Sequence, residues 1–89
     1  MVHFRVRRQS WKVRKPYKPS TPATPSRFLF GRRLREERLK NKMTLEDLSA
    51  VSGITWSYIA QVEVGRRNIA VDNMHVLAAG VGVPLRDLL

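Results

Sequence analysis

The chain has 89 residues, no cysteine and a formal charge of +10 at pH 7. This length allows one small domain, and the lack of cysteine excludes a disulfide framework and a thiolate metal site. The basic charge favours a polyanionic partner, nucleic acid before membrane, and no apolar run approaches the roughly 20 residues of a membrane span.

Positive charge is concentrated at the N-terminus. Residues 1–27 contain eight Lys or Arg and no acidic residue, whereas residues 28–89 contain nine bases and seven acids. Prolines recur at every third position from Pro16 to Pro25, which favours an extended polyproline conformation and opposes a helix. We therefore expect a disordered basic, proline-rich tail over residues 1–27 and a folded domain over residues 28–89.

Three aromatic residues, Phe4, Trp11 and Tyr17, are interleaved with the bases of this tail. Such a mixture can follow phosphates and stack on exposed bases. Several interpretations stay open: the tail binds DNA, binds a protein, or is a solvated segment without a selected role, such as sequence upstream of the true start. It lacks the apolar core of a secretory signal.

The first helix is predicted over residues 28–41. Phe30, Leu34 and Arg38 recur at four-residue spacing and therefore share one face of this helix. Asn41 suits its end, because asparagine tolerates left-handed backbone geometry.

Two short helical patterns meet at Gly53, where a chain leaving a helix often needs a positive φ. Thr44 and Thr55 precede the two patterns, and a hydroxyl at such a position can accept a hydrogen bond from a free backbone N–H. Asp47, three residues after Thr44, approximates a capping box. Together these features predict a helix-turn-helix, with helices over residues 45–51 and 56–64.

Two further helices are expected, over residues 71–80 and 85–89, the second opened by Pro84. The fold class is therefore predicted to be all-α, a compact domain of five helices. Its core is expected to contain these apolar side chains: Phe30, Leu34, Leu45, Leu48, Ile54, Ile59, Val62, Met74, Leu77, Val81, Val83 and Leu88.

Residues 30–89 resemble the Cro and lambda-repressor type of helix-turn-helix domain, also called Xre-like, and the resemblance implies a lambda-repressor-like DNA-binding fold. The chain departs from the family pattern at Leu45, Ser49, Trp56 and Gly80. The residues that carry the resemblance are Leu34, Arg38, Met43, Thr44, Leu48, Gly53, Ile54, Ile59, Val62, Glu63, Gly65, Arg66, Arg67, Asn68, Leu77, Ala78, Val81, Gly82, Val83 and Pro84.

The resemblance implies that the helix over residues 55–64 enters the major groove, where each base pair displays a distinct set of donors, acceptors and methyl groups. Because Ile59 and Val62 face inward, the opposite face holds the residues expected to contact bases. Gln61 can pair bidentately with adenine, and Trp56 can touch a thymine methyl, a sugar or a phosphate, or instead pack on the tail or a neighbouring chain. The expected base contacts are Trp56, Ser57, Ala60 and Gln61.

Cations, amides and hydroxyls around this helix suit phosphate oxygens, which set the register of a protein on DNA. For Tyr58, packing in the core is an equal alternative. The expected phosphate contacts are Thr44, Thr55, Tyr58, Arg66, Arg67 and Asn68. The resemblance further implies a structural ion pair between Arg38 and Glu63.

The implied function is a sequence-specific regulator of transcription that binds double-stranded DNA, in particular a repressor. A homodimer is expected, with its contact surface on Leu85, Leu88 and Leu89. The alternative is an antitoxin that binds a toxin protein and represses its own operon. A third alternative is binding of RNA or of a coactivator.

Neither an enzyme, a cofactor nor a metal site is expected, because His3 and His75 are far apart and no catalytic or metal-binding motif is present. Such a regulator is expected in the cytoplasm of a bacterium or in a phage-infected cell.

Overall fold

The computed structural model describes residues 25–89, which form four α-helices and one 3₁₀ helix, without a strand in that range. In chain order these are α2 (Pro25–Lys40), α3 (Leu45–Ser52), α4 (Trp56–Glu63), α5 (Val71–Gly80) and η1 (Leu85–Leu88). The predicted all-α class is confirmed, and the predicted fifth helix is a single 3₁₀ turn. What was expected of residues 1–24 lies outside the described residues.

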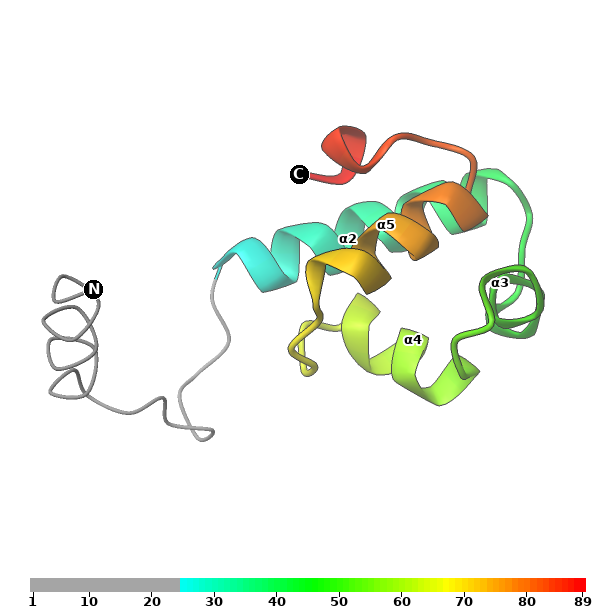
Figure 1. The fold of residues 1–89 in the computed structure, drawn as a ribbon, viewed down its shortest axis with the longest axis horizontal. Coiled ribbons are helices and arrows are strands. Elements are labelled where there is room, and N and C mark those ends of the chain that lie inside the picture. The colour runs from blue at the N-terminus through cyan, green and yellow to red at the C-terminus, as the bar shows by residue number, and fades with distance from the viewer. Residues whose placement is uncertain (1–24) are drawn as a thin grey trace, which may run out of the picture.

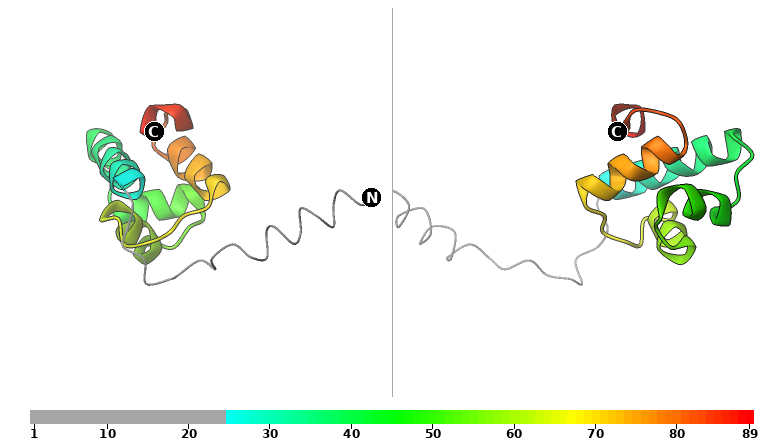
Figure 2. Two further views of the ribbon diagram at one scale, coloured as in Figure 1. Left: turned by 90° about the vertical axis from the view of Figure 1, so that its left-hand side faces the viewer. Right: turned by 45° about the vertical axis from the view of Figure 1, so that its right-hand side comes forward.

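The elements enclose one core (Figure 1). Viewed from the N-terminal end of α2, α2 and α5 stand on the two sides, with η1 above them and α4 below (Figure 2). α3 packs against both α4 and α5. The helix-turn-helix therefore forms one edge of the bundle, and α4 keeps one side free of other elements.

α2 begins at Pro25, three residues earlier than predicted. The prediction treated this proline as a helix breaker, but at the first helical position no backbone N–H is needed and the fixed φ suits the helix. Residues 25–27 therefore belong to the first turn of α2 rather than to an extended tail.

The predicted left-handed residue at the end of α2 is also displaced. Lys42, with a φ of 57°, adopts this conformation instead of Asn41. The Asn41 side-chain amide donates to the carbonyl oxygens of Glu37 (3.0 Å) and Val81 (2.8 Å). Asn41 thus links the end of α2 to the end of α5.

The first cap of the helix-turn-helix is formed as predicted. The Thr44 hydroxyl accepts from the Asp47 N–H (3.0 Å), and the Asp47 carboxylate accepts from the Thr44 N–H (2.9 Å), which completes a capping box. Gly53 has a φ of 76° and donates its N–H to the carbonyl of Ser49 (2.9 Å). Thr55 is the N-cap residue of α4, as predicted, but its hydroxyl accepts no hydrogen bond from the backbone N–H groups of α4.

Most of the predicted core is confirmed. Leu45, Ile54, Met74 and Val83 are only partly buried at its margin, and Ala78 is an additional buried residue. The fully buried members of the predicted set are Phe30, Leu34, Leu48, Ile59, Val62, Leu77, Val81 and Leu88.

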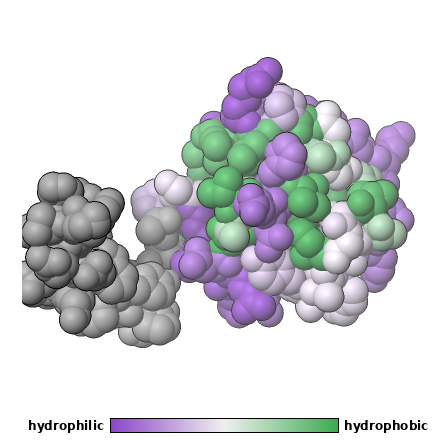
Figure 3. Space-filling model, in the orientation of Figure 1, coloured by the Kyte–Doolittle hydropathy of each residue, from purple (hydrophilic) through white to green (hydrophobic). Residues whose placement is uncertain are grey.

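The burial of Leu88 corrects the predicted dimer surface, because this side chain fills the core and cannot reach a partner. Leu85 is half-buried against the core, and Leu89 is exposed. Hydrophobic residues nevertheless gather on the face formed by α5 and η1, between hydrophilic ones (Figure 3). Val71, at the start of α5, is the most exposed large apolar side chain of residues 25–89.

Gly31, which carries no distinctive signal in the sequence, sets the distance between α2 and α4. A Cβ atom at this position would overlap the carbonyl oxygen of Val62 and lie 2.7 Å from that of Glu63. The backbones of the two helices therefore touch here. Gly80, where the family usually has a stronger helix former, is likewise explained by packing, since a Cβ there would lie 2.7 Å from Leu48 Cδ1.

We expect Gly31→Ala to lower the free energy of unfolding by about 2–3 kcal/mol, because backbone carbonyls cannot yield as a flexible side chain would. Helix propensity alone predicts the opposite, a gain of about 1 kcal/mol. Gly53→Ala is the control: a Cβ there meets nothing within 4 Å, so only the left-handed backbone is penalised, by about 1 kcal/mol. Urea denaturation of both variants measures the difference, and a neutral or stabilised Gly31→Ala would contradict the close approach.

Candidate nucleic-acid interface

The two sides of α4 differ in their surroundings. Ile59, Val62 and Glu63 are buried against the bundle. The predicted base-contact residues all lie on the remaining surface: Trp56, Ser57 and Gln61 are exposed, and Ala60 is partly exposed. In Figure 1, α4 runs along the lower edge of the molecule, so that nothing within residues 25–89 covers this surface. The structure thus collects the four side chains on one accessible face.

A buried ion pair fixes α4 to α2. Arg38 Nε donates to Glu63 Oε2 (2.7 Å) and Arg38 Nη2 donates to Glu63 Oε1 (2.9 Å). The third guanidinium nitrogen, Nη1, donates to the carbonyl oxygen of Met43 (2.8 Å), just before α3. The side chains are only 9% and 5% exposed, and the bidentate geometry matches the planar fork of arginine to the carboxylate.

The hydrogen bond to Glu63 raises the pKa of Arg38 further above its ordinary value, against the opposing effect of burial. A group whose pKa is higher in the folded than in the unfolded state stabilises the fold fully at every pH below the unfolded-state pKa. This stabilisation is lost only as pH rises through the folded-state pKa. Arg38 therefore keeps its charge, and its contribution to stability, throughout the physiological range.

The loop after α4 presents the predicted cations. Gly65, with a φ of 79°, lies against the Phe28 ring, and the Arg66 N–H donates to the carbonyl of Gln61 (2.9 Å). Arg66 and Arg67 are exposed and form no ion pair with any acid of residues 25–89. Their charge is therefore available to a phosphate backbone.

Tyr58 contacts the loop that follows α4. It is half-buried and packs against the core, its hydroxyl donates to the carbonyl oxygen of Asn68 (3.3 Å), and the Arg67 guanidinium lies 4.8 Å from its ring centroid. A cation over an aromatic face is attracted by the ring quadrupole. The packing alternative for Tyr58 is thus present in the structure, and the ring also restrains Arg67 and Asn68, two predicted phosphate contacts.

The two threonines differ. Thr44 uses its hydroxyl as an acceptor in the capping box, so it can still donate its proton to a phosphate. Thr55 is exposed and leaves its hydroxyl unused by α4, together with the free N–H groups of the first helical turn.

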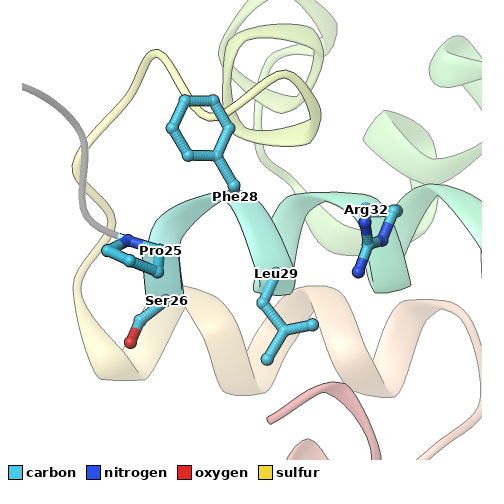
Figure 4. Close-up of a pocket in the computed structure, with 5 residues that line it drawn as sticks. All are labelled: Pro25, Ser26, Phe28, Leu29 and Arg32. Carbon is cyan, nitrogen blue, oxygen red and sulfur yellow. The ribbon is translucent and has the colours of Figure 1, made fainter.

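A shallow, mainly apolar pocket lies at the start of α2, lined by Pro25, Ser26, Phe28, Leu29 and Arg32 (Figure 4). Phe28 points toward the loop after α4, and Leu29 points toward α5. The pocket contains none of the predicted site residues. No group of three His, Cys, Asp or Glu side chains within residues 25–89 could hold a metal ion, and no helix of this range is long and apolar enough to cross a membrane.

A short helix that presents its polar face outward after a glycine bend is the arrangement of helix-turn-helix proteins. The helix-turn-helix family model HTH_3 matches residues 34–88, and the chain belongs to this family. The predicted family and the predicted function, regulation of transcription through DNA binding, are thereby confirmed.

Named relatives are similar over most of the domain. Control protein C.BamHI of Bacillus amyloliquefaciens is 38% identical over 64 residues, which cover 71% of this chain and 79% of the relative. Control protein C.MunI of Mycoplasma sp. is 30% identical over 60 residues, 66% of this chain and 81% of the relative. The crystal structure of the restriction-modification controller protein C.AhdI from Aeromonas hydrophila superposes with a TM-score of 0.71 at 35% identity, and the match covers 74% of this chain and all of that chain.

We expect Arg38→Met to lower the free energy of unfolding by about 3–5 kcal/mol, because it leaves Glu63 buried without its partner. The double variant Arg38→Met/Glu63→Leu should lose less than this single variant, since no buried charge remains. Lys40→Ala is the control, because the Lys40–Glu37 pair (3.1 Å) is solvent-exposed and contributes less than about 0.5 kcal/mol. Urea midpoints measure all three, and a double variant less stable than Arg38→Met would argue against the pair as the origin of the effect.

Proposed function

We propose that the chain is a controller of transcription that represses from a palindromic operator, with α4 of each protomer in one major groove. The observation that carries the proposal is the exposed polar face of α4, held outward by the buried Arg38–Glu63 pair. The relatives support a controller over the alternative of an antitoxin, because two of them are named control proteins and one is described as a restriction-modification controller. We further propose a non-enzymatic role in the cytoplasm, where the operator lies.

The proposed DNA contacts fall into two chemical classes, contacts to base edges and contacts to phosphates. We assign base reading to Gln61 and Ser57, whose side chains can donate and accept at base edges, with Ala60 allowing close approach. Trp56 lies at the same face. We assign phosphate contacts to the exposed loop residues Arg66, Arg67 and Asn68, to the hydroxyls of Thr44 and Thr55, and to Tyr58 beneath the loop.

A homodimer is proposed for geometric reasons, since one short helix reads only a few base pairs and paired half-sites lie about 34 Å apart. The apolar face of α5 and η1 supports it, with Val71 67% and Leu89 57% exposed. Within this face, η1 lies across the bundle from α4, so that a dimer formed through η1 leaves α4 free (Figures 1 and 2).

Selection of bound sequences from random DNA tests the proposal. We expect a palindromic consensus, which gives operator and two-fold symmetry together. Gln61→Ala should lose preference at one base per half-site, at a cost of about 1–3 kcal/mol, because a bidentate contact to adenine is removed. An unselective wild type would contradict the proposed function, and an unchanged consensus with Gln61→Ala would remove this residue from the readers.

The salt dependence of operator binding tests the phosphate contacts. Each phosphate contact contributes a slope of about −0.9 to log affinity against log salt, so Arg66→Ala/Arg67→Ala should flatten the slope by about 2. Arg35→Ala is the control, because Arg35 is also exposed but lies on α2, which belongs neither to the α4 face nor to the proposed dimer surface. Equal effects of the two variants would indicate a general charge effect rather than a contact.

The same measurement tests whether the basic N-terminal segment binds DNA. A deletion of residues 1–24 removes seven Lys or Arg and leaves α2 intact. If these residues contact the duplex, the deletion flattens the slope beyond the effect of the loop arginines. An unchanged slope would exclude a contact between this segment and DNA. The remaining alternatives would be that the segment binds a protein or has no role.

A further inference from the structure

The accessible face of α4 carries two adjacent rows of different chemistry. Ser57 and Gln61, one helical turn apart, form a polar row. Trp56 and Ala60, also one turn apart, form an apolar row beside it. Trp56 is 53% exposed and belongs neither to the buried core nor to the residues packed against it. Its indole is therefore the largest apolar group on the surface that faces DNA.

Trp56 stands at the N-terminal end of α4. It is the first residue of α4, and side chains of an α-helix tilt toward the N-terminus. In helix-turn-helix proteins the N-terminal residues of this helix contact the base edges. The indole thus belongs to the end of the helix that is expected to contact the base edges.

The apolar carbon surface of an indole has one apolar match in the major groove. Base edges there display donors and acceptors, and the only apolar group is the methyl at C5 of thymine, which 5-methylcytosine also carries. If the ring covered a hydrogen-bonding edge instead, it would remove water from polar groups without replacing their hydrogen bonds. A methyl group loses no hydrogen bond when it is covered and gains from leaving water.

We propose that Trp56 reads a pyrimidine C5-methyl group, so that operator binding depends on thymine, or on 5-methylcytosine, at one position per half-site. The proposal rests on the proposed function. Trp56 acts as a specificity-determining residue, and the adjacent polar row reads the neighbouring base pairs. The affinity of the regulator then responds to C5-methylation of cytosine at that position.

The test uses the operator obtained by selection and compares four pyrimidines at each thymine position: thymine, uracil, cytosine and 5-methylcytosine. At the position contacted by Trp56, removal of one methyl should weaken binding about fourfold, the effect expected from exposing one methyl-sized group, and about fifteenfold when both half-sites are changed. The ratio of the affinities for 5-methylcytosine and cytosine should equal the ratio of the affinities for thymine and uracil, because each pair of bases differs by the methyl group alone.

Two substitutions of Trp56 separate the ring from its N–H group. Trp56→Ala should bring both ratios to one, whereas Trp56→Phe, which keeps an aromatic ring without the N–H, should retain them. Val51→Ala is the matched control, since Val51 is 63% exposed but lies on α3, and it should change neither the affinity nor the ratios. Thermal melting of each variant establishes that it is folded.

Three outcomes would overturn the proposal. Equal wild-type affinity for thymine and uracil at every position would exclude methyl reading, while selective operator binding would leave the proposed function standing. If Trp56→Ala keeps the wild-type affinity ratios between methylated and unmethylated pyrimidines, the methyl contact belongs to another residue. Affinity ratios of one in a folded Trp56→Phe variant would assign the discrimination to the indole N–H rather than to the ring. Failure of the wild type to select any DNA sequence would instead refute the proposed function itself.

Discussion

The orientation of α4 depends on the buried contact between Arg38 and Glu63. Glu63 ends the helix, where a negative charge is opposed by the helix dipole, and it is almost wholly removed from water. A cation with several donors offsets both the unfavourable dipole and the loss of water, and the guanidinium of Arg38 does this through two hydrogen bonds to Glu63. It also donates to the carbonyl oxygen of Met43. One side chain of α2 thereby joins the end of α4 to the entry of α3.

This contact belongs to a longer seam between α2 and α4. Gly31 and Leu34 precede Arg38 on the same face of α2, and together they provide a backbone contact, an apolar contact and an ionic contact. An eight-residue helix has little stability of its own, so α4 owes its helical state to this seam and to α3. Rigid support behind α4 allows the outer face to remain unpaired in the absence of DNA.

The parts of the fold set by local rules could be predicted from the sequence. The bend at Gly53, the capping box of Thr44 and Asp47, and the apolar core follow from residue type and spacing. The Arg38–Glu63 pair came instead from the family resemblance, because spacing alone does not bring residues 25 positions apart together.

The errors in the prediction have a common physical origin, which is that tertiary contacts override local preference. Asn41 was free to adopt a left-handed conformation, but its amide serves as a bridge to Val81, and Lys42 makes the turn. Leu88 is expected both in the core and on a partner surface, and the packing of η1 leaves only the core position. Pro25 is the exception, because the error there is local: the suitability of proline for the first helical position is missed. Gly31 gave no local signal at all, since only the approach of α4 requires it.

The outer face of α4 obeys a different constraint from the inner one. Replacing Ile59 or Val62 would disturb packing, whereas Ser57 and Gln61 make no contact that the fold requires. Stability therefore restricts the inner face of α4 and leaves the side chains of its outer face free to vary. The exposed Trp56 lies outside the core cluster, so packing in the core does not account for it, whereas the proposed contact with a pyrimidine methyl group does.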